Sequence, residues 1–410
     1  MSDKNILVIG TYDTKDDELG FLANVIREQG GKVVTMDVSV LGDPSKPCDF
    51  AKHDVASEGG SSIQAAIDSG DENKAMQIMA KGASLLAARL HREGRFDGMI
   101  VLGGTMGTDL ALDVASALPL GVPKYIVSTV SFSPLIPAQR LAADTQMILW
   151  AGGLYGLNSV CKASLSQAAG AVLGAARAVQ LPDPKKPLIG MMSLGTSALK
   201  YVIPLKPALE ERGFEVAVFH ATGMGGRAFE SLAAQGAFAC VFDFCTQEVG
   251  NHVNGSNISA GADRLTNAGA NGTPQIVAPG CYDLVDVVGW QPIADKWDKH
   301  LKHAHNRLLT SIVLAAAETK LVAQAHVDRL AQATGPVKMI LPTHGLGEWD
   351  REGADLHNPD GLAAFLAELE VSLPDNIQAH RLACHINDAE FADKALEIFD
   401  GWCADGTVVS

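Results

Sequence analysis

Three short loops in the first half of the chain carry residues that can bind an anion, and each follows a predicted buried strand. They read Gly10-Thr-Tyr-Asp-Thr-Lys15, Gly103-Gly-Thr-Met-Gly-Thr108 and Ser128-Thr-Val-Ser131. The carboxyl ends of parallel strands share one edge of a sheet, so we expect these loops to lie together. The candidate ligand-binding residues are Gly10, Thr11, Asp13, Thr14, Lys15, Gly103, Gly104, Thr105, Gly107, Thr108, Ser128 and Thr129.

The loop Gly103–Thr108 has the composition of a phosphate-binding turn. Its glycines let the backbone approach a ligand, and the free amides of a helix predicted to begin at Asp109 favour an anion. Thr105 and Thr108 add hydroxyl groups. The loop matches neither the Walker A motif nor GxGxxG, so no nucleotide family follows from it. The alternative is a tight turn that uses glycine only for packing.

Two side chains of the first loop suit the same ligand. Lys15 offers a point charge for a phosphate oxygen, and Asp13 can orient a metal-bound water or a hydroxyl group. Asp13 and Thr14 also stand where helix caps are common, and the acidic run that follows Lys15 is typical of a solvated first turn. Taken singly, Asp13 and Thr14 are therefore explained by capping.

A second glycine loop, Ala221-Thr-Gly-Met-Gly-Gly-Arg227, lies between a strand ending at His220 and a helix beginning near Ala228. Its glycines expose amides, and the guanidinium group of Arg227 matches a carboxylate or a phosphate. This loop therefore predicts a second anion site, for a substrate. The substrate-binding candidates are Thr222, Gly223, Gly225, Gly226 and Arg227.

Histidines, cysteines and acids also gather at the predicted strand ends of the second half. Glu248 can form an acid/base pair with His220 or His344, suited to proton abstraction or hydrolysis beside a bound carbonyl compound, and Glu248 with His220 is the candidate catalytic pair. No HExxH or CxxC motif fixes a metal geometry, so no metal ligand is assigned. The residues expected at this edge are His220, Asp243, Cys245, Glu248, His252, Cys281, His344 and His385.

Short apolar runs alternate with amphipathic stretches along the whole chain, which is typical of parallel sheets covered by helices. The segment Leu181-Pro-Asp-Pro-Lys-Lys-Pro187 reads as an exposed connector and divides the chain into domains at 1–182 and 183–410. We therefore predict two doubly wound α/β domains with mostly parallel sheets. An apolar pattern from about His300 to Thr334 predicts one long helix.

Composition narrows the functional classes. The chain has 410 residues, with 32 Lys and Arg against 47 Asp and Glu, which gives a net charge of −15. This negative charge disfavours general binding to nucleic acids and binding to acidic membrane surfaces. Seven scattered cysteines fit reduced thiols, and the start of the sequence does not read as a signal peptide. We expect a cytoplasmic protein with a small-molecule ligand.

Several motifs in order resemble the family of Tm-one-like ATP-binding proteins. They are Gly10-Thr-Tyr-Asp-Thr-Lys-Asp-Asp-Glu-Leu19, Val218-Phe-His-Ala-Thr-Gly-Met-Gly-Gly-Arg227, Pro274-Gln-Ile-Val-Ala-Pro-Gly280 and His385-Ile-Asn-Asp388. The resemblance implies two Rossmann-like domains, ATP binding in the N-terminal one and a homodimer. Met106 departs from the family's more usual glycine at that position. Some relatives carry a fused TIM-barrel region, so the resemblance implies that any such partner is a separate protein.

Three functional hypotheses follow. The leading one is an ATP-binding metabolic enzyme that acts on a small carboxylate or carbonyl compound, with Mg²⁺ as a candidate companion of ATP. The second is a nucleotide-binding regulator or interaction module that does not consume ATP. The third is a metal-dependent hydrolase or lyase whose N-terminal pocket is only structural. Strand-end loops of this kind serve many reactions, so the substrate stays open.

Overall fold

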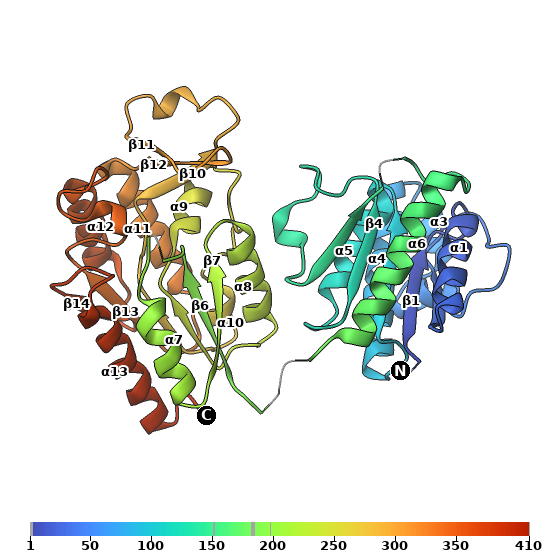
Figure 1. Cartoon of the computed structure of the whole chain (residues 1–410), viewed down its shortest axis with the longest axis horizontal. Helices are drawn as coiled ribbons and strands as arrows, with labels where there is room; N and C mark the ends of the chain where they lie inside the picture. Colours follow the sequence, from blue (N-terminus) through green and yellow to red (C-terminus); the bar gives the residue numbers. More distant parts are fainter. Residues whose placement is uncertain (1–2, 151, 182–184, 197, 410) are drawn as a thin grey trace. The chain divides into compact units, whose positions relative to one another are not determined.

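Two units make up the chain, Met1–Pro182 and Asp183–Ser410, and they divide within the proline-rich segment. The computed structural model describes residues 3–150, 152–181, 185–196 and 198–409 (Figure 1). Residues 182–184 of the connector predicted from its prolines lie outside these ranges. Each unit is described by itself below.

The N-terminal unit contains a five-stranded, fully parallel sheet. All residues of the central strand β3 are buried, in keeping with its continuous apolar run, as expected for a strand covered on both faces. In spatial order the strands are β2 (Lys32–Asp37), β1 (Asn5–Gly10), β3 (Gly98–Gly103), β4 (Lys124–Ser128) and β5 (Thr145–Leu149).

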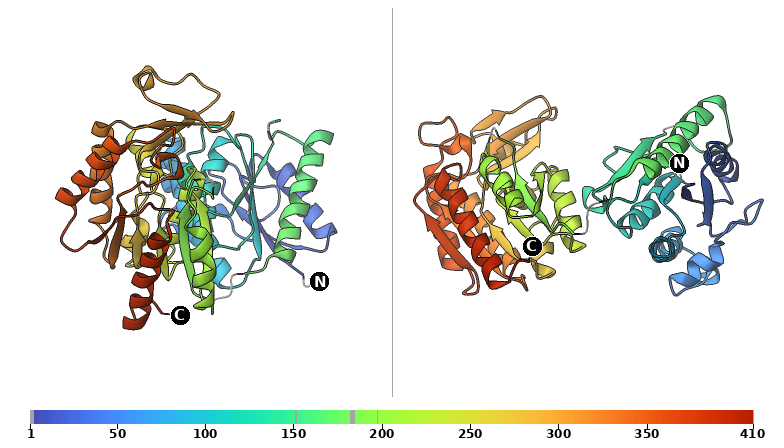
Figure 2. Two further views of the ribbon diagram at one scale, coloured as in Figure 1. Left: turned by 60° about the vertical axis from the view of Figure 1, so that its left-hand side comes forward. Right: turned by 60° about the horizontal axis from the view of Figure 1, so that its bottom comes forward.

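Helices cover both faces of this sheet. Alternate residues of β1 point to opposite sides: Ile6 and Val8 pack with α1 and α6, whereas Leu7 and Ile9 pack with the other helices. Helices α1 and α6 lie side by side (Figure 1, Figure 2). The helices are α1 (Asp16–Glu28), α2 (Lys52–Glu58), α3 (Ile63–Asp68), α4 (Glu72–Arg92), α5 (Thr105–Ser116) and α6 (Ser159–Ala178).

The C-terminal unit repeats this design with a six-stranded, fully parallel sheet. In spatial order its strands are β14 (Gln378–Leu382), β13 (Val337–Pro342), β9 (Gln275–Val277), β8 (Cys240–Asp243), β6 (Leu188–Ser193) and β7 (Glu215–His220). The two parallel sheets confirm the predicted α/β class.

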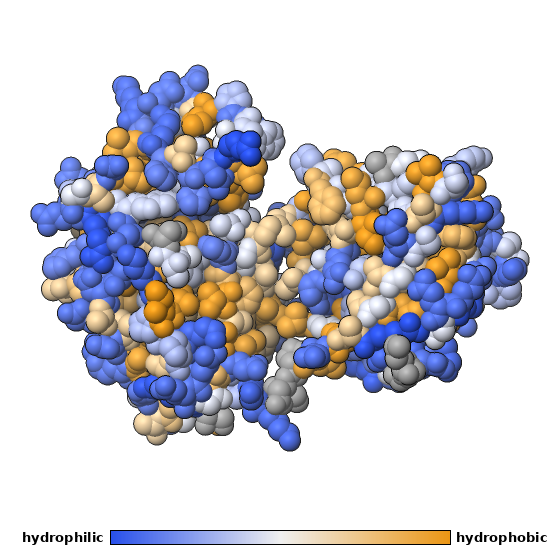
Figure 3. Space-filling view, in the orientation of Figure 1, coloured by the Kyte–Doolittle hydropathy of each residue, from blue (hydrophilic) through white to orange (hydrophobic). Residues whose placement is uncertain are grey.

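Aromatic side chains fill one face of the second sheet. Phe242 of β8 meets Phe399 of α13 edge to face, and Phe244 meets Phe391 in the same way. Hydrophilic residues are dense over the outer side of α12 and α13 (Figure 3). The helices of the unit are α7 (Val202–Glu211), α8 (Met224–Ala234), α9 (Gln247–Val253), α10 (Asn267–Ala270), α11 (Ala316–Leu330), α12 (Pro359–Ser372) and α13 (Ala389–Asp405).

The prediction of one long helix from His300 to Thr334 is wrong. The segment instead begins with strands β11 (Lys302–Ala304) and β12 (Leu309–Val313), which form a small antiparallel sheet with β10 (Leu284–Val288), and only then enters α11. Asn306 breaks the helix because its side chain accepts hydrogen bonds from the amides of residues 308 and 309. The β-branched residues of β12 then favour a strand.

The strand order reverses once in each sheet, and this decides where ligands can bind. The chain starts at β1, moves first to β2 and then crosses to β3 on the other side of β1. The connections that leave β1 and β3 therefore enter opposite helical layers. Open α/β sheets bind ligands at such a point. The equivalent point of the second sheet lies between β6 and β8.

No helix within the described ranges is long and apolar enough to cross a membrane.

Gly103 is required by the close contact between β3 and α5. A Cβ atom at residue 103 would lie 2.6 Å from the Cα atom of Gly107, where neither backbone can move freely. We expect G103A to destabilise the chain by about 1–3 kcal/mol. The control G174A, at an exposed helical site with nothing within 4 Å, should be about 0.5–1 kcal/mol more stable than the wild type. Calorimetric unfolding without ligand measures both, and an unchanged stability of G103A would contradict this contact.

Candidate functional site

A cavity of about 500 Å³ lies at the carboxyl edge of the N-terminal sheet, where the strand order reverses between β1 and β3. We call it the N-terminal cavity. It is bounded by the loop after β1, the loop after β3 and the segments around α3 and the start of α4. The predicted residues that line it are Thr11, Asp13, Thr14, Lys15, Gly103, Gly104, Thr105 and Gly107.

Lys15 is held on the wall of this cavity by its own loop. Its Nζ donates to Thr11 Oγ1 at 3.3 Å and to Thr14 Oγ1 at 3.2 Å. The carbonyl oxygen of Thr11 accepts the amides of Thr14 and Lys15, which closes the turn. Within the described residues no carboxylate pairs with Lys15, so its charge is available to an anion.

The first turn of α5 presents backbone amides to the same cavity. Helix α5 begins at Thr105 with Gly104 as its N-cap, and no side chain caps it. The amides of its first turn therefore need an outside acceptor. A Cβ atom on Gly104 would meet only Thr129 Oγ1, at 3.8 Å, so the backbone there is open to a ligand. Together with the helix dipole these groups form an anion site.

The remaining predicted residues of the N-terminal unit support these loops from behind. Thr108 Oγ1 lies 2.6 Å from Ser128 Oγ, and both side chains are buried. A Cβ atom on Gly10 would lie 2.7 Å from a methyl carbon of Leu19. Gly10, Thr108, Ser128 and Thr129 do not line the N-terminal cavity. The first three lie where a strand end contacts a helix.

An apolar wall, which the sequence reading missed, faces the glycine loop. Leu41 is 77% exposed and Ile67 is 40% exposed although both are aliphatic. Such side chains gain from being covered by an apolar group. The wall consists of Val40, Leu41, Ala66, Ile67, Ala75 and Met76. The run Val40-Leu41, directly after the second strand, was the available signal.

Asp13 keeps one carboxylate oxygen without a partner. Its Oδ2 accepts from the amide of Gly42 at 3.3 Å, whereas its Oδ1 is buried and has no hydrogen bond within the described residues. Oxygen ligands are what Mg²⁺ prefers. The residue therefore fits a magnesium ion that accompanies a phosphate ligand.

In the C-terminal unit, the predicted substrate loop is already filled by the chain itself. Glu248 Oε1 accepts from the amides of Gly223 at 2.6 Å and Gly226 at 3.1 Å. A Cβ atom at residue 226 would lie 1.8 Å from a Glu248 oxygen, and one at residue 225 would lie 1.8 Å from the carbonyl oxygen of His220. Gly226 thus makes room for this carboxylate, and the amides of Gly223 and Gly226 are not free for an external anion.

Arg264 binds the other side of Glu248. Its Nε donates to Glu248 Oε2 at 2.8 Å, and its two terminal nitrogens hold Asp243 in a fork at 2.5 and 2.7 Å. Glu230 is a third carboxylate within reach, at 3.3 Å. All four side chains are buried. Burial raises the pKa of Glu248 to about 7, against the opposing effects of Arg264 and the two amides.

His220 and Glu248 are not brought together as an acid/base pair. His220 ends the edge strand β7 and is exposed, whereas Glu248 is fully buried, and no hydrogen bond joins them within the described ranges. Arg227 is also engaged, since it donates to both oxygens of Asp263 at 2.7 and 2.9 Å. Of the predicted substrate-binding residues, Thr222 is exposed, and its side chain has no hydrogen-bond partner among the described residues.

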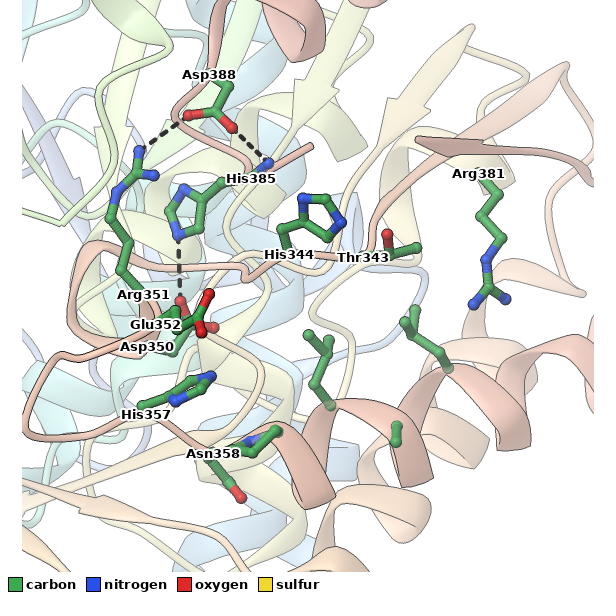
Figure 4. Close-up of a pocket in the computed structure, with 14 residues that line it drawn as sticks. Thr343, His344, Asp350, Arg351, Glu352, His357, Asn358, Arg381, His385 and Asp388 are labelled. Atoms are coloured by element: carbon green, nitrogen blue, oxygen red, sulfur yellow. Dashed lines mark hydrogen bonds and ion pairs between the residues drawn. The ribbon is translucent and has the colours of Figure 1, made fainter. Parts of the chain in front are cut away.

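Other strand-end residues form a second cluster. His344 and His385 lie at the ends of β13 and β14, where they line a cavity of about 620 Å³, which we call the C-terminal cavity (Figure 4). Cys281 has a positive φ of 53° and lies buried beside Cys245. Across the parts of the chain that the structure describes, no three His, Cys, Asp or Glu side chains converge to hold a metal ion.

Comparison with known proteins gives the family. Models of the uncharacterised protein family UPF0261 match residues 4–181 with their N-terminal domain and residues 186–403 with their C-terminal domain. A UPF0261 protein of Brucella melitensis is 54% identical over 404 residues, covering 98% of this chain and 97% of the relative. A UPF0261 protein of Clostridium tetani is 34% identical over 392 residues, covering 95% and 96%.

The chain belongs to the UPF0261 family. The tomato (Solanum lycopersicum) ToMV resistance protein Tm-1 is 30% identical over 425 residues, which cover 96% of this chain and 55% of the tomato protein. The resemblance drawn from the motifs is thereby confirmed. The solved structure of E. coli ADP-heptose LPS heptosyltransferase II covers 98% of this chain and all of its own, at 11% identity. Its TM-score of 0.21 is too low to carry an argument.

Arg264 and Asp283 are the residues of this UPF0261 chain that the sequence reading missed most clearly in its second unit. Neither belongs to a recognisable motif, and each is buried by segments distant in sequence. Burial and the nearby carboxylate of Asp350 raise the pKa of Asp283 to about 8. A protonated carboxylic acid is therefore the stable form of Asp283 near neutral pH.

The raised pKa of Asp283 predicts a pH dependence of stability. The folded state holds this proton more tightly than the unfolded chain, so the contribution is present below the ordinary pKa near 4 and is lost as pH rises to about 8. D283N cannot ionise, so its stability relative to the wild type should increase from pH 5 to pH 8. Chemical unfolding at several pH values measures it, with D355N, an exposed site, as control. A difference independent of pH would refute the shift.

Proposed function

We propose that this UPF0261 protein binds ATP in the N-terminal cavity. One observation carries the proposal: the uncapped, glycine-bounded start of α5 and the unpaired ammonium group of Lys15 face one cavity whose other wall is apolar. The site lies at the reversal of strand order, where folds of this type bind nucleotides. The family resemblance points to the same ligand.

The phosphate groups belong at the α5 end of the cavity. Amides of the first turn of α5 donate to phosphate oxygens, and Lys15 supplies a positive charge from the neighbouring loop. Charge-assisted hydrogen bonds of this kind contribute about 1.5–3 kcal/mol each. Asp13 would hold Mg²⁺ or its bound water through its unpaired oxygen.

The adenine ring belongs against the apolar wall. Leu41 and Ile67 are exposed to solvent on the cavity wall and would lose that exposure under a flat ring. Burying apolar surface stabilises by about 25 cal/mol per Å². Glu72, which also lines the cavity, is a candidate acceptor for the exocyclic amino group.

Two uses of ATP remain candidates. The first is a metabolic enzyme acting on a small carboxylate or carbonyl compound. The second is a regulator that binds ATP without turnover, and the occupied glycine loop favours it, because Glu248 and Asp263 already neutralise the predicted substrate groups. Incubation with ATP and Mg²⁺, alone and with keto acids and sugar acids, distinguishes them by the appearance of ADP, AMP or phosphate.

Calorimetric titration of K15M with ATP tests the site. The variant loses the point charge on the phosphates but no internal ion pair, so we expect ten- to hundredfold weaker binding, about 1.5–3 kcal/mol, with unchanged thermal stability without ligand. K32M is the matched control. Lys32 begins β2, at the opposite edge of the sheet, and pairs only with exposed Asp3 within the described residues.

Equal affinity of K15M and the wild type would contradict the assignment of Lys15 to the phosphates. Absence of saturable ATP binding by the wild type would contradict the proposed function as a whole.

A further inference from the structure

The C-terminal cavity has the dimensions of a metabolite site. It measures about 620 Å³, within the range of pockets that enclose small ligands, and lies where the carboxyl ends of β13 and β14 meet the start of α12. It is distinct from the N-terminal cavity and from the filled glycine loop at Gly223–Gly226, because it shares no residue with either.

A rigid frame forms one wall of this cavity. Asp388 accepts from the amide of His385 at 2.8 Å and from Arg351 at 3.1 Å (Figure 4). His385 Nδ1 accepts from the amide of Asn387, so its Nε2 carries the proton and points to Gly347 O and the Asp350 carboxylate. The His385-Ile-Asn-Asp388 motif is thus explained as the support of the cavity wall.

Three polar side chains on the cavity have no such partner. His344, Glu352 and His357 line it, and no hydrogen bond or ion pair engages their side chains within the described residues. The close-up shows Glu352 and His357 near each other and His344 apart from them (Figure 4). A fixed frame with unpaired donors and acceptors around it is the arrangement that specific binding of a polar ligand requires.

The lining holds the carboxylates of Asp350, Glu352 and Asp388 and the guanidinium groups of Arg351 and Arg381, so an acidic ligand depends on the arginine donors that are left over. The fork of Arg351 is used by Glu348 and Asp388. Within the described residues Arg381 pairs only with exposed Glu370, which does not line the cavity. Arg381 therefore keeps donors for a ligand, and the imidazoles of His344 and His357 also line the cavity. Glu352 and Asn358 add acceptors, which suit hydroxyl groups.

A short apolar strip completes the lining. Leu362, Ala363 and Leu366 of α12 also line the cavity. Such a strip accommodates the carbon chain of a small ligand. No group of three metal-binding side chains converges there or elsewhere in the described ranges, so the polar groups are not assigned to a metal ion.

We propose that the C-terminal cavity binds a small polyhydroxylated anion, with its carboxylate or phosphate on Arg381 and His344 and its hydroxyl groups on Glu352, His357 and Asn358. This site stands independently of ATP binding in the other unit. If ATP is consumed by an enzyme reaction, this cavity supplies the substrate site that the filled glycine loop lacks.

Calorimetric titration of the full chain tests the proposal with two probes. Gluconate carries a carboxylate and glycerol phosphate carries a phosphate; sorbitol and glycerol are their uncharged counterparts. We expect saturable binding of at least one anion and much weaker binding of its uncharged counterpart. The probe that binds identifies the acidic group.

Two variants locate the binding. R381Q removes the charge, and A363W fills the cavity from an exposed helical position, so each should weaken anion binding about tenfold or more without lowering the melting temperature. R307Q, an exposed arginine outside the cavity, is the matched control, and K15M should bind the anion normally.

Failure of both anions to saturate the wild type at millimolar concentration overturns the proposal. Equal binding of the uncharged polyols, or unchanged binding by R381Q and A363W, overturns it as well. ATP titration of the same samples separates these outcomes from failure of the N-terminal site.

Discussion

The backbone amides at the start of a helix must find an acceptor, and this requirement shapes both units. In the C-terminal unit the acceptor is internal, because Glu248 reaches the amides of Gly223 and Gly226. In the N-terminal unit helix α5 begins after Gly104 with no capping side chain and opens on a cavity. Two glycine loops with similar composition therefore differ: the amides of one are bonded to an internal carboxylate, whereas those of the other have no capping side chain.

The filled loop imposes its own constraint on the C-terminal unit. A buried carboxylate needs compensation, and Arg264 provides it while also binding Asp243 and Glu230. One guanidinium group thus faces three carboxylates in a buried volume. Loss of one partner from such a network typically costs about 3–5 kcal/mol. The network fixes the loops after β7 and β8.

Local patterns in the sequence predicted the repeated strands and helices, because buried parallel strands read as continuous apolar runs. They also predicted the loop that carries Lys15 and the loop that carries Gly104, because each follows a strand directly. They failed for the state of the second glycine loop. Glu248 lies 25 residues from Gly223, so its approach depends on packing that no local pattern reports. Arg381 and His357 meet at one cavity only through the docking of α12, and the helix predicted across 300–334 failed because an Asn turn overrode the apolar spacing.

Hydrogen exchange measured with and without ATP and Mg²⁺ tests the central claim most directly, because it reports on the backbone amides themselves. The account predicts slower exchange at the first turn of α5, residues 105–107, and in the loop 11–15, with no change at residues 223–226, where Glu248 already holds the amides. Protection at 223–226, or unchanged exchange at 105–107 under saturating ATP, would contradict it.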